Sequence, residues 1–177
     1  GQSLIRNISK NHPNAIIDAT YFSKPFKSSL VESDNKKINL NYIAYYSAFK
    51  NTKTYDQIWH FATYGQPSKF INDWKPVVKL NTEDIISLSS SLKEGGKFFY
   101  ASTSELYGQS ENSSEDMVPS TFTCKPRSIY IDSKRLGESI VYSLFPCHDF
   151  RIFRICLAYS PYFKKGDKRV LYDLVTK

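Results

Sequence analysis

The sequence of 177 residues predicts an α/β fold in which helices cover both faces of a parallel sheet. Short apolar segments with strand character alternate along the whole chain with segments of helical periodicity. Strands that are apolar and separated by helices are typical of parallel sheets, because a parallel pair needs a long crossover connection. The sequence contains no internal repeat and no low-complexity tract that would point to another architecture.

The expected elements follow one another from the first residues onward. Leu4, Ile5 and Ile8 share one face of a helix over 2–11, and Pro13 ends that helix. Asp18 falls near the end of the strand that comes next. The expected elements after the first helix are a strand over 15–20, a polar loop over 23–37, a short strand over 37–40, a short helix over 42–51, a strand over 57–63, a helix over 75–94 that Gly95 and Gly96 stop, a strand over 97–102, a polar loop over 109–127, a helix over 128–145, a strand over 149–159 and a helix that starts at 168.

The composition is that of an ordinary soluble globular domain, and we expect one domain over residues 1–177. Hydrophobic residues make up 41% of the chain and charged residues 23%, which is enough for one core. The net charge of +7 comes from scattered lysines, so we expect a solvated surface and no nucleic-acid partner, while an anionic small-molecule substrate stays compatible. No segment approaches the roughly 18 apolar residues of a membrane span. Cys124, Cys147 and Cys156 show no metal-binding spacing and indicate reduced thiols of a cytoplasmic protein without a metal site.

Two short motifs carry the chemistry. Tyr130 and Lys134 are four residues apart, so they share one face of the helix over 128–145. A nearby ammonium lowers the pKa of a phenol, which lets the pair take a proton from a substrate hydroxyl. The segment "STSELYG" follows the strand over 97–102, where Thr103 or a flanking serine can hold the same substrate oxygen. Ligands of open α/β sheets bind at the carboxyl ends of the strands, so both motifs are expected in one crevice. A chance Tyr–Lys spacing and ordinary turn chemistry remain alternatives.

A set of further motifs accompanies these two along nearly the whole chain, and together they resemble one family. They are "IIDAT" with Asp18, "WHFATYGQP", "LNT" with Asn81, "YASTSELYG", "KPRSIYIDSKRLGE" and "RICLAYSP". The chain resembles the extended short-chain dehydrogenase/reductase family, which contains nucleotide-sugar epimerases, dehydratases and decarboxylases. The resemblance implies a Rossmann-like domain, bound NAD, a UDP- or dTDP-sugar substrate and a homodimer in the intact enzyme.

The resemblance also implies roles for individual residues. Thr103 would bind the sugar hydroxyl, Tyr130 would be the base, and Lys134 would bind the nicotinamide ribose and tune Tyr130. The implied catalytic residues are Thr103, Ser104, Glu105, Tyr130 and Lys134; the implied cofactor-binding residues are Gly1, Asp18, Asn39, Leu40, Phe61, Ala62, Thr63, Tyr130 and Lys134; and the implied substrate-binding residues are Thr103, Arg127 and Leu157. His60, at the end of a buried strand, is interpreted as a structural histidine.

The residues around Thr103 indicate the sub-family. The sequence Thr103-Ser104-Glu105 and the arginine at 127 are similar to those of UDP-glucuronate decarboxylases, whereas 4,6-dehydratases carry an Asp-Glu pair at positions 104 and 105. An arginine suits a substrate carboxylate, although a solvated loop charge is the alternative for Arg127. Leu157 stands where a substrate-contacting asparagine is common. A 4-epimerase or a 4,6-dehydratase therefore remains an alternative.

The glycine-rich phosphate turn of the family, G-x-x-G-x-x-G, is absent from this sequence. Gly1 precedes the first helix and Asp18 follows seventeen positions later, which fits the last glycine of that motif and the acid that binds the adenosine ribose. We therefore expect a fragment that lacks the first strand and most of the C-terminal substrate part. An inactive fragment or binding module is the third alternative.

Overall fold

The structure, a computed structural model, describes residues 1–22, 39–50, 52–63, 67–108, 112–117, 122–146 and 149–156. The chain divides into two compact units, Gly1–Lys53 (unit 1) and Thr54–Lys177 (unit 2).

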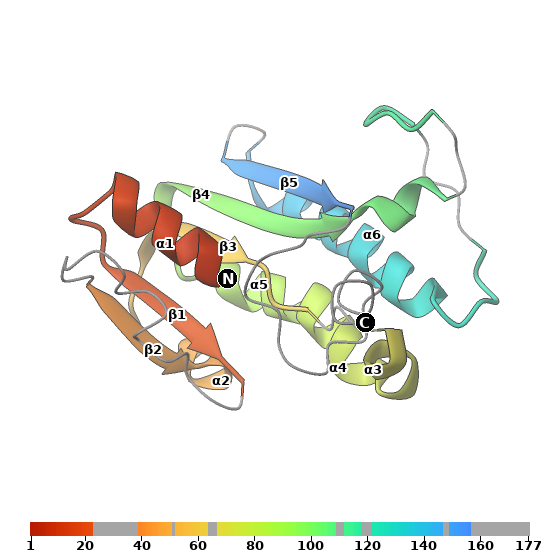
Figure 1. Ribbon diagram of the computed structural model, residues 1–177, viewed down its shortest axis with the longest axis horizontal. Helices are drawn as coiled ribbons and strands as arrows, with labels where there is room; N and C mark the ends of the chain where they lie inside the picture. The colour runs from red at the N-terminus through yellow and green to blue at the C-terminus, as the bar shows by residue number, and fades with distance from the viewer. Residues whose placement is uncertain are drawn as a thin grey trace, which may run out of the picture. The chain divides into compact units, whose positions relative to one another are not determined.

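Unit 1 is built from two parallel strands and two helices. The elements are α1 (Gln2–Asn11), β1 (Ile17–Tyr21), β2 (Leu40–Ala44) and α2 (Tyr45–Ala48). Strands β1 and β2 pair in parallel, and α1 contributes the buried Ile5 to a small core with Ala19. The red helix and the orange strands of Figure 1 are these elements. The helix predicted over 2–11 is confirmed, and its Ile5 is buried in this core.

Two predictions for unit 1 need correction. The helix expected over 42–51 starts only at Tyr45, because Tyr42–Ala44 continue β2 opposite Ala19–Tyr21. Asp18 is the second residue of β1 and does not lie near the strand's end. The loop predicted over 23–37 lies outside the described residues.

Unit 2 contains a three-stranded parallel sheet in the order β3-β4-β5. The α/β fold class with parallel strands is confirmed. Phe98 and Tyr100 lie on one face of this sheet and form the main core with Ile85, Val141 and Phe145. The elements are β3 (Tyr55–His60), α3 (Pro67–Asn72), α4 (Trp74–Asn81), α5 (Glu83–Ser89), β4 (Leu92–Thr103), the 3₁₀ helix η2 (Ser104–Tyr107), α6 (Ser128–Leu144) and β5 (Phe150–Ile155).

The predicted helix over 75–94 is wrong in two respects. It is divided into α4 and α5 at Thr82, whose backbone is not helical (φ −132°, ψ −80°). Gly95 and Gly96 do not stop a helix but lie within β4, where Gly95 has φ 70°. The pairing of β3 with β4 is irregular there: Tyr55 lies opposite Leu92 and Gln57 opposite Lys97. The glycines therefore allow a bulge in a strand.

The remaining elements agree with the sequence more closely. Helix α6 matches the prediction over 128–145 within one residue, and the strand predicted over 97–102 is the second half of β4. The strand expected over 57–63 begins two residues earlier and ends at His60. Strand β5 starts within one residue of its predicted start, while residues from 157 onward, including the helix expected from 168, lie outside the described residues. Within the part of the chain that the structure describes, no helix is long and apolar enough to cross a membrane.

Candidate active site

Tyr130 lies in the first turn of α6, close to the carboxyl end of β4. Its ring stacks on Phe70 of α3, with the ring centroids 4.5 Å apart, in a small cluster that includes Val77. Thr103, the last residue of β4, accepts a hydrogen bond from the Glu105 backbone N–H through its Oγ1 (3.3 Å), which caps η2. Both Thr103 and Tyr130 are buried.

The pKa of Tyr130 is raised above its ordinary value, chiefly because the phenol is buried. A hydrogen bond with the Thr103 side chain opposes this, the Glu105 carboxylate adds to it, and Arg127 and Thr63 lower the pKa again. The Thr63 Oγ1 atom is buried, and it has no hydrogen-bond partner of normal geometry among the described residues. Sequence reasoning predicted the opposite direction, a pKa lowered by Lys134. That prediction is wrong for this arrangement.

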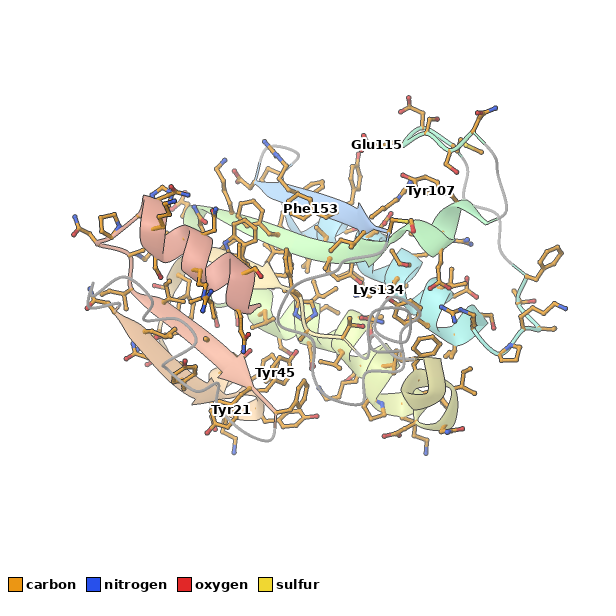
Figure 2. All side chains as sticks on the ribbon, in the orientation of Figure 1. Tyr21, Tyr45, Tyr107, Glu115, Lys134 and Phe153 are labelled. Carbon is orange, nitrogen blue, oxygen red and sulfur yellow. The ribbon has the colours of Figure 1, made fainter. Side chains whose placement is uncertain are left out.

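Lys134 explains the difference, because its ammonium is held elsewhere. The side chain is 1% exposed, Nζ donates to the Ala101 carbonyl oxygen at 2.6 Å, and it lies 4.8 Å from the centre of the Tyr100 ring. Figure 2 shows Lys134 between the sheet of unit 2 and its helices. Burial lowers the pKa of Lys134 to about 7, with Glu138 acting in the other direction. Lys134 is absent from the groups that shift the Tyr130 pKa.

A short hydrogen-bonded chain holds the first turn of α6 against α4. Asn81 donates through Nδ2 to Ser133 Oγ at 2.9 Å, and Ser133 Oγ donates to the Tyr130 carbonyl oxygen at 2.8 Å. Both polar side chains are buried. Sequence reasoning missed Ser133, and no local pattern identifies it, because its partner lies 52 residues away.

Glu105 and Arg127 form a bidentate ion pair at the edge of the site. Arg127 Nε donates to Oε2 at 2.8 Å and Nη2 donates to Oε1 at 2.5 Å, with the side chains 43% and 33% exposed for Arg127 and Glu105. The arginine Cζ also lies 5.3 Å from the centre of the Phe70 ring. Arg127 is therefore not a solvated loop charge, and the pKa of its guanidinium is raised, first by the hydrogen bond to Glu105. Ser104 begins η2 next to this pair and is partly buried.

His60 is a structural histidine, as interpreted from the sequence. It is 2% exposed, and its Nε2 lies 2.7 Å from the Leu80 carbonyl oxygen, which can only accept, so Nε2 carries the proton. Its ring stacks on Tyr100, with centroids 5.9 Å apart. Burial and the Lys134 charge lower its pKa to about 4, so the ring is neutral at pH 7.

The other predicted cofactor-binding residues divide between the units. In unit 1, Asp18 Oδ1 accepts from Asn41 Nδ2 at 2.8 Å and Oδ2 lies 3.3 Å from Lys53 Nζ. The other members of this set are engaged through their backbones. Gly1 accepts from Ile5 N, Asn39 accepts from Ile17 N, and Leu40 pairs with Ile17, while Phe61, Ala62 and Thr63 follow β3 in unit 2. Leu157 lies outside the described residues.

The sequence predicts no metal site. No cluster of three or more His, Cys, Asp or Glu side chains able to bind a metal occurs within these ranges. Cys124 and Cys156 are free and exposed.

Parallel strands alternating with helices are the architecture of a Rossmann-like domain. The chain belongs to the NAD dependent epimerase/dehydratase family, whose model matches residues 2–177. The cofactor expected from the sequence, NAD, is the cofactor of that family. A comparison with curated proteins finds no match.

Two solved structures share the fold. The PbgP3 protein from Burkholderia pseudomallei is 17% identical, with a TM-score of 0.60 over 85% of this chain and 48% of its own. UDP-glucuronic acid 4-epimerase from Bacillus cereus, determined in complex with NAD, is 18% identical, with a TM-score of 0.55 over 85% of this chain and 50% of its own. The chain thus spans about half the length of each of these proteins.

Proposed function

We propose that this chain is part of an NAD-dependent enzyme that modifies a UDP- or dTDP-sugar, and that it acts as a UDP-glucuronate decarboxylase. The observation that supports the proposal is that the Tyr130 phenol lies near two threonine side chains. Thr103 is the last residue of β4, and Thr63 follows the end of β3. Such a cluster suits a sugar hydroxyl that has to be oriented and deprotonated. A cytoplasmic location and a homodimer of the intact enzyme are part of the proposal.

The residues near Tyr130 fit the redox end of NAD. Thr63 Oγ1 is a buried hydroxyl that has no hydrogen-bond partner among the described residues, so it can serve a ligand. Phe61, Ala62, Thr63, Tyr130 and Lys134 of unit 2 are proposed to hold this end of the cofactor. In unit 1, Gly1, Asp18, Asn39 and Leu40 are the residues proposed to hold an adenosine. NAD, when bound, would supply the hydride acceptor for oxidation at C4 of the sugar.

Tyr130 takes the proton from the 4-hydroxyl, while the Thr103 hydroxyl holds the same oxygen. Because burial raises the pKa of the phenol, a cation has to come close before Tyr130 can act as a base at neutral pH. Lys134, one turn further along α6, is the candidate: its Nζ would turn from the Ala101 carbonyl toward the phenol. Lys134 is thus proposed as a group that moves between two partners.

Arg127 and Glu105 are proposed to handle the substrate carboxylate. Once C4 is a ketone, the bond between C5 and the carboxyl carbon can break, and its electron pair is delocalised onto the C4 oxygen as CO2 leaves. A guanidinium offers a carboxylate two parallel hydrogen bonds, and Arg127 already makes such a pair with Glu105. Binding the substrate would therefore exchange Glu105 for the sugar carboxylate.

The same ion pair favours a second candidate function. Since Glu105 already neutralises Arg127, the site also suits a sugar without a carboxylate, as in a 4-epimerase or a 4,6-dehydratase. The absence of an Asp-Glu pair at positions 104 and 105 weighs against the dehydratase. An inactive binding module is the remaining alternative.

The test uses the purified protein with UDP-glucuronate labelled in its carboxyl carbon. We expect labelled CO2, and we expect Tyr130→Phe to reduce its release by roughly 10²–10⁴-fold while NAD affinity, measured by calorimetry, changes little. Tyr142→Phe is the matched control on α6, because Tyr142 is 66% exposed and should leave activity unchanged. Conversion of UDP-glucuronate to its 4-epimer without CO2 would replace the decarboxylase by the 4-epimerase. If Tyr130→Phe kept more than about a tenth of the activity, Tyr130 would not be the base.

A further inference from the structure

Asp18 does not present its negative charge to solvent. Its side chain is 5% exposed, and each carboxylate oxygen has a partner, Asn41 Nδ2 on Oδ1 at 2.8 Å and Lys53 Nζ on Oδ2 at 3.3 Å. The Lys53 side chain, in contrast, is 56% exposed. A ligand that approaches this part of unit 1 therefore meets an ammonium group in front of the carboxylate.

This arrangement differs from the one that usually makes a dinucleotide site prefer NAD over NADP. An acid at the adenosine ribose hydrogen-bonds to the 2′-hydroxyl of NAD and disfavours the 2′-phosphate of NADP, which a nearby basic group accommodates. Here the acid is paired with its own cation, so the charge of the pair is balanced. Each carboxylate oxygen already accepts one hydrogen bond, which leaves fewer acceptor positions for a ribose 2′-hydroxyl.

We propose that the adenosine site of unit 1 accepts a 2′-phosphorylated dinucleotide, NADP, as well as it accepts NAD. The inference rests on the proposed function, which assigns Asp18 to the adenosine ribose. Lys53, whose side chain is 56% exposed, turns from Asp18 to the 2′-phosphate and so exchanges one anionic partner for another. Asn41 keeps its hydrogen bond to Asp18 and holds the carboxylate in place.

The experiment titrates the full chain with NAD and with NADP by calorimetry or NMR, up to millimolar ligand. In the wild-type protein the two dissociation constants should agree within about threefold. Lys53→Met exposes the Asp18 charge, so NADP affinity should fall by about tenfold or more relative to NAD, and Lys53→Arg should restore it. The effect of Lys53 should shrink as salt is added, because exposed charges are screened.

Lys50→Met is the matched control, because Lys50 is also an exposed lysine of unit 1 and no contact with the dinucleotide is assigned to it. It should leave the ratio of the two affinities unchanged, and a thermal melt of each variant checks that the fold is intact. A wild-type preference for NAD of tenfold or more would overturn the inference and leave the proposed function standing. If neither dinucleotide bound, both the inference and the assignment of NAD to this chain would be overturned.

Discussion

Gly137 determines how closely α6 can approach α4 and β4. A methyl group on its Cα would lie 2.5 Å from the Asn81 carbonyl oxygen and closer still to Tyr100 Oη. Neither neighbour can yield easily, because one is backbone and the other is a buried ring. The same helix carries Tyr130 and Lys134, so the missing side chain at 137 keeps both residues at the end of β4.

Gly137→Ala should therefore lower the free energy of unfolding by roughly 1–3 kcal/mol, the usual cost of overpacking a core. The sign of this change in the free energy of unfolding is informative, because replacing an unhindered helical glycine by alanine stabilises a helix by about 1 kcal/mol. Urea denaturation measures the change. Ser139→Ala, at an exposed position of the same helix, is the control and should stay near wild type. A Gly137→Ala protein as stable as wild type would show that α6 can shift without loss.

His60 gives the stability a predictable dependence on pH. Its pKa is about 4 in the folded protein and near 6.5 in an unfolded chain, so between these values the unfolded chain binds the proton. The contribution of His60 to the free energy of unfolding should thus be fully present above about pH 6.5. It should be lost as the pH falls toward 4, which lowers the stability by on the order of 3 kcal/mol. Urea midpoints at pH 4.5 and 7 measure the change. His60→Gln should flatten the profile, and His12→Gln, at an exposed site, should not.

At the scale of the elements, the sequence predicts those whose pattern is local. Helix α6 has seventeen residues with regularly spaced apolar positions, and its predicted bounds hold within one residue. The placement of Thr103 near Tyr130 also follows from the sequence, because parallel strands end at a common edge. These predictions need only short-range periodicity and one topological rule.

The elements that were missed depend on partners elsewhere in the chain. The apolar spacing continues through Thr82, yet the helix restarts there with the acidic pair Glu83 and Asp84 in its first turn. Gly95 and Gly96 look like a helix stop until the register of the neighbouring strand shows a bulge. Contacts of the site such as Glu105 with Arg127 join residues 22 positions apart, which no local pattern specifies.

At the scale of the whole molecule, each unit has hydrophobic clusters of its own. Among the described residues, unit 1 buries Ile5 and Ala19 in one small cluster and Tyr45 against Phe22 and Phe49. Unit 2 buries large side chains in its main cluster, among them Ile85, Phe98 and Tyr100. Since burial of apolar surface is the main stabilising contribution, unit 1 should open at a lower free energy than unit 2.

Hydrogen exchange of the native protein tests this order. Amides of β4 near Phe98 and Tyr100 should be the most protected, and amides of β1 should exchange through an opening of lower free energy. Ile85→Ala removes a fully buried side chain from unit 2 and should lower the protection of β4 by about 2–5 kcal/mol while β1 changes little. Ile5→Ala is the reciprocal variant and should affect β1 alone. Equal losses of protection in both units from either substitution would show that the chain opens as one cooperative unit, and the division into two cores would then have no energetic meaning.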